Sequence, residues 1–266
     1  MEALEDVYNK IKSIYTSYPS SEKNRVLKQR LITSLKFLDY AFESYGASRI
    51  AMSFNGGKDC LVLLLLCIYC LREKYGGSMA KQKLAEIPFV FVRPKDEFYE
   101  MDEFVQDCKN LYGLNIISIS LPMKEAFTLF LADNPNIQAI LIGIRRLDPH
   151  GLHRVAFEMT DKGWPKFMRV QPILDWTYSE VWDLLLETKT KYCILYDKGY
   201  TSLGGISDTS PNPALKNKDG SYSPAYLLPD ASLERFGRNQ TVPFERTNSR
   251  YLYESGPSSY APSEVS

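Results

Sequence analysis

This 266-residue sequence lacks several features that would point to common protein classes. It carries no excess of either charge, because Lys plus Arg and Asp plus Glu number 32 each, and this balance argues against bulk binding to nucleic acid or an anionic membrane. Its longest apolar run has about a dozen residues, short of the ~20 that cross a bilayer. The N-terminal segment is charged and amphipathic, unlike a secretory leader. We therefore expect a soluble, cytoplasmic protein with no nucleic-acid or membrane partner.

Histidine and cysteine are also scarce. The two histidines form no evident catalytic dyad. The five cysteines are an odd number, which favours reduced thiols in the cytosol over a disulfide framework. Cys67 and Cys70 form a C-x-x-C pair, but they lie inside the apolar run and no second pair follows at zinc spacing. We interpret them as core residues.

Two widespread nucleotide-binding signatures are missing. Neither G-x-x-x-x-G-K-[ST] nor G-x-G-x-x-G occurs, so the chain has neither a Walker P-loop nor a dinucleotide fingerprint. His150 and His153 resemble the H-x-G-H motif of another nucleotidyltransferase class, but the glycine is misplaced and the motif lies mid-chain. Any nucleotide-binding function must depend on a different motif.

What the sequence does contain is an alternation of short apolar segments and helical patterns. Two N-terminal helices are expected at residues 4–18 and 23–45, where apolar residues recur at three- and four-residue spacing. Strands are then expected at 49–54, 87–92, 114–119 and 139–143, and the helices between them at 59–75, 98–111 and 124–132. This order is typical of βαβ units and predicts an α/β fold with a Rossmann-like, doubly wound, mainly parallel sheet. Ligands of such sheets bind at the carboxyl ends of the strands.

The second half of the sequence is less regular. A loop-rich stretch at 145–166 precedes a predicted short strand at 167–172, and the capping box from Thr177 to Glu180 predicts the start of a helix. A polar loop is expected at 207–224 and a last short helix within 227–239. We divide the chain into an N-terminal helical segment (1–46), a nucleotide-binding core (47–206), a C-terminal subdomain (207–253) and a disordered tail (254–266).

The segment from Ser53 to Asp59 lies between the first strand and an apolar helix. Gly56 and Gly57 let the backbone turn sharply and approach a ligand, and the helix N-terminus behind them attracts phosphate. Lys58 would add a mobile positive charge. Asp59 would repel phosphate unless Mg²⁺ lay between them, so it is a candidate metal ligand. The plain structural interpretation is a tight turn with Asp59 as N-cap, but the polar residues crowded there favour a phosphate loop.

This loop and a series of later motifs resemble one family. Ser-Phe-Asn-Gly-Gly-Lys-Asp-Cys looks like the modified pyrophosphatase loop of the PAPS reductase-like ATP-pyrophosphatase superfamily, which has an adenine nucleotide alpha hydrolase-like fold. More narrowly, the chain resembles the eukaryotic FAD synthases (FMN adenylyltransferases) of the fungal, monofunctional form. The later blocks are Gly143-Ile-Arg-Arg-x-Asp-Pro149, Asp161-x-Gly-Trp-Pro165, Arg169-x-Gln-Pro172, Thr201-Ser-Leu-Gly204 and Leu233-Glu-Arg-x-Gly-Arg238. No single block is specific, whereas the ordered set over residues 49–238 is.

The resemblance implies Mg²⁺-dependent transfer of the adenylyl group of ATP to FMN, giving FAD and pyrophosphate. The implied ATP-binding residues are Met52, Ser53, Asn55, Gly56, Gly57, Lys58, Val92, Arg93, Ile142 and Gly143. The implied flavin-binding residues are Asp161, Lys162, Gly163, Trp164, Arg169 and Arg238. The implied catalytic residues are Asn55, Asp59, Asp148, Arg235 and Arg238, with Asp59 as the metal ligand. The expected partners are the small molecules ATP and FMN, and the expected state is a monomer.

The chemistry itself makes modest demands on side chains. Because the FMN phosphate is already an anion, transfer needs in-line positioning and neutralisation of the leaving pyrophosphate, with no general base. Two arginines suit this task, since Arg binds phosphate in a bidentate way. That requirement agrees with a sequence so poor in histidine.

Several alternatives stay open at this point. Trp164 could simply pack in its loop, Asp161 could be a solvated carboxylate, and Arg235 and Arg238 could share a helix face and form surface salt bridges. A PAPS (sulfonucleotide) reductase would need a nucleophilic cysteine near the C-terminus, and no cysteine follows Cys193. An amide- or thiol-forming ATP pyrophosphatase would need a supply of ammonia or sulfur. A nucleotide sensor without turnover would not need the two arginines.

Overall fold

The structure is a computed structural model, and it describes residues 2–238. Two N-terminal helices, α1 (Glu2–Thr16) and α2 (Glu22–Tyr45), confirm the expected pair to within two residues at each end. Ser21 caps α2, because its side chain accepts a hydrogen bond from the backbone N–H of Asn24. The apolar side chains of both helices belong to the main hydrophobic core, which they share with the central sheet.

The centre of the molecule is a six-stranded sheet in the order β3-β2-β1-β4-β6-β5. Its strands are β1 (Ile50–Ser53), β2 (Pro88–Val92), β3 (Asn115–Ile119), β4 (Ala139–Leu141), β5 (Phe157–Met159) and β6 (Met168–Val170). Neighbouring strands are parallel, apart from the edge strand β5, which is antiparallel to β6. The chain moves outward from β1 to β3 and then returns to β4 on the other side of β1, so the predicted doubly wound, mainly parallel sheet is confirmed.

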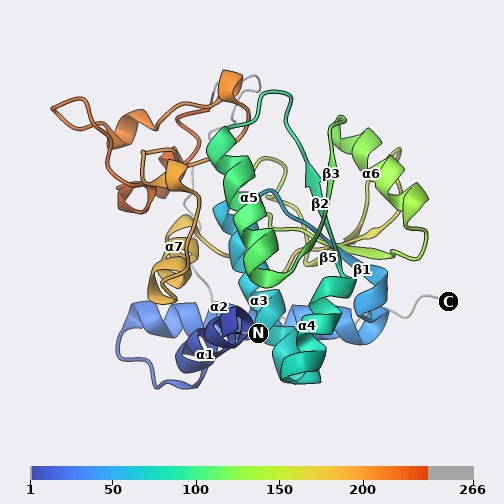
Figure 1. Cartoon of the computed structure of the whole chain (residues 1–266). Coiled ribbons are helices and arrows are strands. Elements are labelled where there is room, and N and C mark those ends of the chain that lie inside the picture. Colours follow the sequence, from blue (N-terminus) through green and yellow to red (C-terminus); the bar gives the residue numbers. More distant parts are fainter. Residues whose placement is uncertain (1, 239–266) are drawn as a thin grey trace.

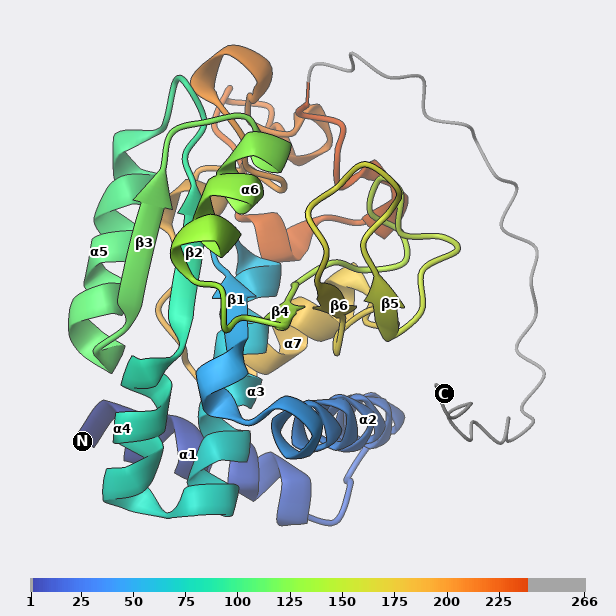
Figure 2. The same cartoon turned by 90° about the vertical axis from the view of Figure 1, so that its right-hand side faces the viewer.

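Helices cover both faces of this sheet (Figures 1 and 2). The helices α3 (Lys58–Tyr75), α5 (Tyr99–Tyr112) and α7 (Tyr178–Glu187) pack with α1 and α2 on one face, and together they bury the larger apolar cluster. The helix α6 (Met123–Asp133) covers the other face, where Phe127 and Phe130 pack on Val90 and Ile140. Burial on both sides explains why the strands are apolar along their whole length.

The apolar helix α3 runs through the middle of the core. Its residues from Leu61 to Leu71 are all buried, which confirms that Cys67 and Cys70 are core residues. The five cysteines are free. At the start of α7, Thr177 and Glu180 form the predicted capping box, in which each side chain bonds the other residue's backbone N–H. Within residues 2–238 no helix combines the length and hydropathy needed to cross a membrane.

Three elements differ from the expectation. The helix α4 (Gly77–Glu86) and the strand β5 were not expected. The short helix expected within 227–239 is wrong, because the described part of that range is not α-helical and residue 239 lies outside the described residues. The C-terminal part instead contains isolated 3₁₀ turns. The 3₁₀ turns among the described residues 2–238 are η1 (Ala47–Arg49), η2 (Ile194–Tyr196), η3 (Ile206–Asp208), η4 (Pro213–Leu215), η5 (Ala225–Leu227) and η6 (Ala231–Leu233).

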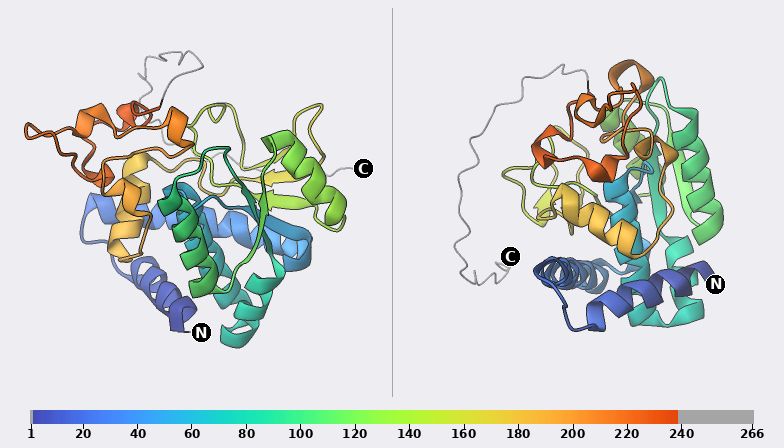
Figure 3. Two further views of the ribbon diagram at one scale, coloured as in Figure 1. Left: turned by 45° about the horizontal axis from the view of Figure 1, so that its top comes forward. Right: turned by 90° about the vertical axis from the view of Figure 1, so that its left-hand side faces the viewer.

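The C-terminal turns and the N-terminal helices lie at opposite ends of the molecule. Figures 1 and 3 show η3 to η6 at one end and α1 and α2 at the other, with the sheet between them. The expected loop at 207–224 belongs to this C-terminal end. It is ordered by its own hydrogen bonds, including that from the backbone N–H of Ala214 to Asn212 Oδ1. The expected tail at 254–266 lies outside the described residues.

Candidate active site

The loop from Ser53 to Asp59 lies at the carboxyl end of β1, as the sheet topology requires. Asn55 is exposed at the tip of the turn, and its side-chain oxygen accepts a hydrogen bond from the backbone N–H of Gly57 at 2.9 Å. The N-cap of α3 is Gly57, with no side-chain cap, so the interpretation of Asp59 as N-cap is wrong. Asp59 lies instead in the first turn of the helix, where its carboxylate pairs with side chains rather than capping the helix.

Two glycines are required by the geometry of this edge. Gly56 has a φ of +75°, and a Cβ on it would come within 2.8 Å of Met101 Sδ and 2.9 Å of Val105 Cγ2 in α5. At the end of β4, a Cβ on Gly143 would lie 3.0 Å from the backbone nitrogen of Cys60. The ends of β1 and β4 therefore approach the start of α3 closely, at the position where doubly wound sheets bind ligands.

A cavity of about 550 Å³ opens beside this loop. Asn55 borders it together with Val92 and Arg93 from the end of β2, so three of the predicted ATP-binding residues line one hollow. The prediction that the loop borders a cavity at the carboxyl edge is confirmed. The remaining lining comes from the segments after β2 and β3 and from the C-terminal half, namely Phe91, Pro94, Lys95, Glu97, Met101, Ser120, Leu121, Pro122, Met123, Leu203 and Gly204.

The wall of the cavity after β2 is held by ion pairs. Arg93 Nη1 lies 2.5 Å from Glu97 Oε2, and the other end of its guanidinium donates to Asp102 of α5. Burial raises the pKa of Glu97 above its ordinary value. Sequence reasoning placed Arg93 here but missed Lys95, Glu97 and the residues after β3, although their positions directly after strands could have indicated them.

Behind the loop lies a buried cluster of five charged side chains: Lys58, Asp59, Arg145, Asp148 and Glu234. Lys58 Nζ lies 3.1 Å from Asp59 Oδ2 and also donates to Glu234. Arg145 Nε lies 2.7 Å from Asp59 Oδ1, an ion pair without hydrogen-bond alignment. Arg145 Nη2 contacts Glu234 Oε1 at 2.6 Å and Asp148 Oδ1 at 3.1 Å. Asp148 also accepts from the backbone N–H of Arg145 at 2.7 Å.

The cluster corrects two expectations from the sequence. Lys58 was expected to be a mobile charge facing phosphate, but its side chain is 2% exposed and held inside the cluster. Its backbone N–H donates to Tyr196 Oη at 2.8 Å, so that group already has a protein partner. Arg145 begins the loop-rich stretch expected at 145–166, where an arginine is ordinarily exposed, yet its side chain is 1% exposed. Sequence reasoning did not single out Glu234 at all.

The charges of the cluster control each other's titration. Burial alone would lower the pKa of Lys58, but the carboxylates of Asp59 and Glu234 raise it above its ordinary value. Burial would raise the pKa of Asp59, and the neighbouring Lys58 and Arg145 lower it instead. Asp148 has a raised pKa, because its burial outweighs the attraction of Arg145. The cluster therefore holds three carboxylates and only two cations. Asp148 is a carboxylate whose charged form the cations do not stabilise enough to offset its burial.

Arg235 and Arg238 follow Glu234 but do not share a helix face, because no α-helix forms there. Arg238 Nη1 donates to the backbone oxygen of Leu203 at 2.9 Å, and Nη2 lies 2.8 Å from Asp208. Arg235 makes a long contact of 3.4 Å with Ser202 Oγ. Burial and the charge of Arg238 lower the pKa of Arg235, so this guanidinium is poorly compensated by the protein.

Five of the six predicted flavin-binding residues lie on the β5–β6 hairpin, whereas Arg238 lies in the C-terminal segment. Asp161 is paired with two arginines, at 2.9 Å from Arg169 Nη1 and 3.1 Å from Arg154 Nη2. These hydrogen bonds keep the pKa of Asp161 below its ordinary value. Lys162 and Gly163 are exposed in the same turn, and Trp164 is 37% exposed.

This hairpin turn is separate from the cavity beside Asn55. It joins Met159 to Met168, the amino end of β6, whereas the loop at Ser53 follows the carboxyl end of β1. The structure thus brings Asp161, Lys162, Gly163, Trp164 and Arg169 together with one another but not into that cavity.

The remaining predicted residues occupy the strand ends near the loop. Met52 is fully buried in β1, so its side chain belongs to the core. Ser53, Ile142 and Gly143 are partly exposed. Within residues 2–238 no group of three or more His, Cys, Asp or Glu side chains is arranged to hold a metal ion.

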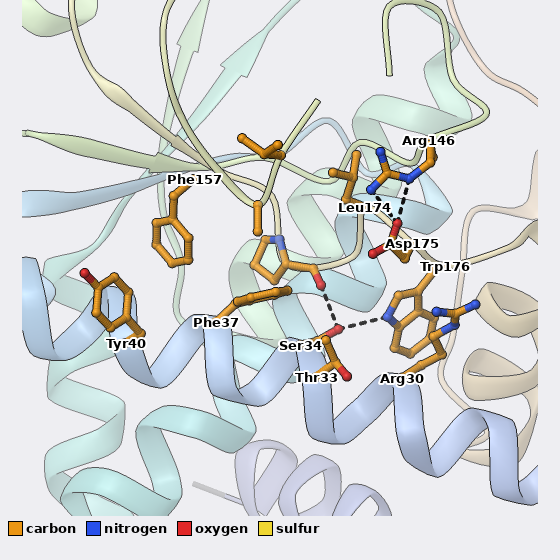
Figure 4. Close-up of a pocket in the computed structure, with 13 residues that line it drawn as sticks. Arg30, Thr33, Ser34, Phe37, Tyr40, Arg146, Phe157, Leu174, Asp175 and Trp176 are labelled. Carbon is orange, nitrogen blue, oxygen red and sulfur yellow. Dashed lines mark hydrogen bonds and ion pairs between the residues drawn. The ribbon is translucent and has the colours of Figure 1, made fainter. Parts of the chain in front are cut away.

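A second hollow, of about 530 Å³, lies between α2 and the chain around Phe157, Pro172 and Trp176 (Figure 4). Side chains alternate along β5, so Phe157 faces α2 while Glu158 faces the side of Arg169. Phe37 and Tyr40 of α2 contact the ring of Phe157 in this hollow.

The polar groups of this second hollow already bind one another. Ser34 Oγ donates to the backbone oxygen of Pro172 and accepts from Trp176 Nε1, and Arg146 pairs with Asp175. Ser34, Trp176, Arg146 and Asp175 are therefore already engaged with protein partners in this hollow.

Comparison with known proteins shows the family of the chain. The model of the phosphoadenosine phosphosulfate reductase domain family matches residues 49–130 and 122–211. A protein of Schizosaccharomyces pombe named "Probable FAD synthase" is 72% identical over 266 residues, which is 100% of both chains. The chain belongs to the FAD synthase family and carries its phosphoadenosine phosphosulfate reductase domain.

Two solved structures are similar over most of the chain. The FMN adenylyltransferase of Candida glabrata in complex with FMN and an ATP analogue is 31% identical, with a TM-score of 0.81 over 89% of this chain and 99% of that one. The same enzyme in complex with FAD and inorganic pyrophosphate is 30% identical, with a TM-score of 0.81 over 89% of this chain and 98% of that one.

Proposed function

We propose that this protein is an FMN adenylyltransferase that converts ATP and FMN to FAD and pyrophosphate. The observation that carries the proposal is the position of the loop from Ser53 to Asp59, which borders a cavity at the carboxyl edge of a doubly wound sheet. Similarity to the Candida glabrata enzyme, whose complexes contain FMN with an ATP analogue and FAD with pyrophosphate, supports the same reaction.

In this proposal ATP occupies the cavity beside Asn55, with its base toward Val92 and Arg93 and its phosphates at the glycine loop. Arg235 and Arg238 lie in the C-terminal segment and are candidates to bind the transferred and leaving phosphoryl groups. The lowered pKa of Arg235 supports this role, because burial and the nearby guanidinium of Arg238 leave the charge of Arg235 poorly compensated until an anion binds. The FMN phosphate attacks as an anion, so the site only has to align it and neutralise charge.

The flavin ring would be bound by the turn on the β5–β6 hairpin. Trp164 offers an exposed indole there, and Arg154 and Arg169 hold the carboxylate of Asp161 in a fixed position. A carboxylate held by two cations keeps its charge and orientation, which suits it to accept hydrogen bonds from a polar ring edge. Arg238 would bind the phosphate at the other end of FMN.

Mg²⁺ fits the donor set of the buried cluster. Three carboxylates face two cations there, and the side chains of Asp59 and Asp148 are 18% and 22% exposed, so neither carboxylate is completely enclosed by the protein. Mg²⁺ is commonly held by one or two carboxylates together with substrate phosphates, so a three-ligand protein cage is not required. Asp59 and Asp148 would hold the ion, which would neutralise phosphate charge when bound with ATP.

A thiol-dependent reductase is a weaker candidate on the same fold. That chemistry needs an accessible thiolate. Burial raises the pKa of Cys60, Cys70 and Cys108 to about 12 and that of Cys193 to about 11. The pKa of Cys67 is raised for the same reason. These thiols therefore stay protonated at neutral pH.

The test is direct. The purified protein is incubated with ATP, FMN and Mg²⁺, and the flavins are separated by chromatography while pyrophosphate is measured. We expect FAD and pyrophosphate in equal amounts, with a loss of both in Arg238→Ala and a normal yield in Arg146→Ala, which removes an arginine of the second hollow. Unchanged FMN with the intact protein would refute the acceptor assignment.

The setting of the enzyme is also part of the proposal. Free cysteines suit the reducing cytoplasm, and we propose a cytoplasmic monomer. Light scattering on the purified protein, with and without substrates, tests the oligomeric state. A stable dimer at micromolar concentration would contradict the monomer.

A further inference from the structure

Glu234 connects two parts of the candidate active site that are far apart in the sequence. It immediately precedes Arg235, and it is 9% exposed. Its carboxylate binds Lys58, which belongs to the first turn of α3, and receives Arg145 Nη2 at 2.6 Å and 2.7 Å on its two oxygens. One side chain therefore ties the C-terminal segment to the glycine loop and to the segment that follows β4.

The backbone around Glu234 is fixed by hydrogen bonds as well. The backbone oxygen of Glu234 accepts from Thr201 Oγ1 at 2.5 Å, and that of Leu233 accepts from Asn212 Nδ2 at 2.8 Å. Asn212 Nδ2 also donates to Thr201 Oγ1 at 2.8 Å. Both the backbone and the side chain of Glu234, the residue before Arg235, are therefore fixed by hydrogen bonds.

Because Lys58 and Arg145 are buried, their charges depend on the carboxylates that contact them, including that of Glu234. Lys58 and Arg145 are almost completely enclosed, at 2% and 1% side-chain exposure, and buried cations require anionic partners. Removing the charge of Glu234 leaves Lys58 with Asp59, and leaves Arg145 to share Asp59 and Asp148. No ion pair of residue 234 would then hold the segment that contains Arg235 and Arg238 against the glycine loop.

We propose that Glu234 is a positioning residue, which sets the approach of Arg235 and Arg238 to the phosphates by holding their segment on Lys58 and Arg145. This inference rests on the proposed adenylyl transfer. It differs from a general role in stability, because it requires that the effect of Glu234 on the reaction passes through the arginines. If Glu234 only stabilised the fold, its loss would lower the rate by the same factor whether or not Arg235 and Arg238 were present.

The test compares Glu234→Gln with a matched control, Glu180→Gln. Glu180 is 8% exposed and pairs with Arg30 at 3.1 Å, so both changes remove a buried glutamate charge from an ion pair, but Glu180 lies at the start of α7 away from the cavity. We expect Glu234→Gln to lower kcat by roughly tenfold or more at saturating ATP and FMN, and Glu180→Gln to change kcat by less than about twofold. Thermal unfolding of both variants shows whether their stability losses are comparable.

A double-mutant cycle distinguishes positioning from simple stabilisation. In an Arg235→Ala/Arg238→Ala background, Glu234→Gln should lower the remaining kcat by less than about twofold, because both groups it positions are already absent. Full additivity of the two losses would overturn the proposal, and so would an unchanged kcat in Glu234→Gln. If Glu234→Gln does not fold, Glu234→Asp replaces it in the same cycle. The aspartate keeps the charge but has a shorter reach, so we again expect a lower kcat, and a normal kcat overturns the proposal.

The same assays separate this inference from the proposed function. If the unmodified protein forms no FAD, the proposed function fails whatever the variants do. If it forms FAD at a normal rate and Glu234→Gln does too, the function stands and the positioning role is wrong.

Discussion

The sharpest structural requirement at the loop is the glycine at position 56, and replacing it by alanine tests the loop geometry. Gly56 has a φ of +75°, in the left-handed region, which residues with a Cβ seldom adopt. The added Cβ would also lie 2.8 Å from Met101 Sδ and 2.9 Å from Val105 Cγ2. Both neighbours belong to α5, and Val105 is fully buried, so α5 would have to shift to make room.

The two effects can be given magnitudes. The left-handed backbone costs about 1–2 kcal/mol for a non-glycine residue. Overpacking a well-filled site costs about 1–3 kcal/mol. Gly56→Ala should therefore lower the free energy of unfolding by about 2–5 kcal/mol, since the two terms act on different atoms. This is a large fraction of the stability of an ordinary domain.

Gly113→Ala is the matched control. Gly113 ends α5 with a φ of +69°, and no atom lies within 4 Å of the Cβ it would gain. It should therefore show the backbone cost alone. Urea denaturation of both variants gives the difference, which is the crowding term of about 1–3 kcal/mol. Equal losses in the two variants would show that α5 does not press on the loop, and a normal rate of FAD formation in Gly56→Ala would show that the turn is not needed for substrate binding.

Three further outcomes are expected. Trp164→Ala should raise the KM for FMN and leave that for ATP nearly unchanged; the opposite pattern would remove the flavin assignment. Hydrogen bonds from Arg169 and Arg154 lower the pKa of Asp161, so its ion pairs persist above the unfolded pKa and are lost only as pH falls through the lower folded value. The KM for FMN should therefore not rise through loss of this charge between about pH 7 and pH 5. Burial raises the pKa of Cys60 to about 12, so iodoacetamide at pH 8 should leave it unmodified, as mass spectrometry of native protein can check.

The architecture was predictable where local patterns agree with tertiary burial. The apolar run of α3, the helical periodicity of α2 and the capping box of α7 each specify their element within a few residues. The helix α4 buries only Ala80 and Leu84, so it has too few apolar residues for a clear period. The three residues of β5 form a strand because β6 pairs with them, and no local signal encodes that pairing.

The helix wrongly expected near the C-terminus shows how backbone chemistry overrides apolar spacing. Pro229 lacks the backbone N–H and disfavours a helical conformation at Leu228. Asp230 then caps a single turn by accepting from the backbone N–H of Ser232. The proline was visible in the sequence and should have excluded a helix that included it.

The site was predictable in its position and less so in its charges. The loop after β1 had to lie at the carboxyl edge, and the end of β2 had to lie beside it, because parallel strands share that edge. The orientation of Lys58 could not be predicted, since it depends on a glutamate 176 residues away. Local sequence favoured a lysine facing solvent, whereas the structure buries it in ion pairs with two carboxylates, those of Asp59 and Glu234.

The charged cluster also explains why three motifs that are far apart in the sequence would have to occur in the same chain to form the site. Lys58 comes from the glycine loop, Arg145 and Asp148 from the segment after β4, and Glu234 from the C-terminal segment. Each buried charge depends on the others for neutralisation, so the three segments are ordered as a unit rather than one by one. A chain with the same fold and the same glycine loop, but with an uncharged residue in place of Glu234, would keep Asp59 and Asp148 as partners of the two cations but would lose the ion pairs that hold the segment of Arg235 and Arg238 on Lys58 and Arg145. The glycine loop alone therefore indicates the superfamily, and the glutamate that precedes the two arginines is what completes the site proposed for adenylyl transfer.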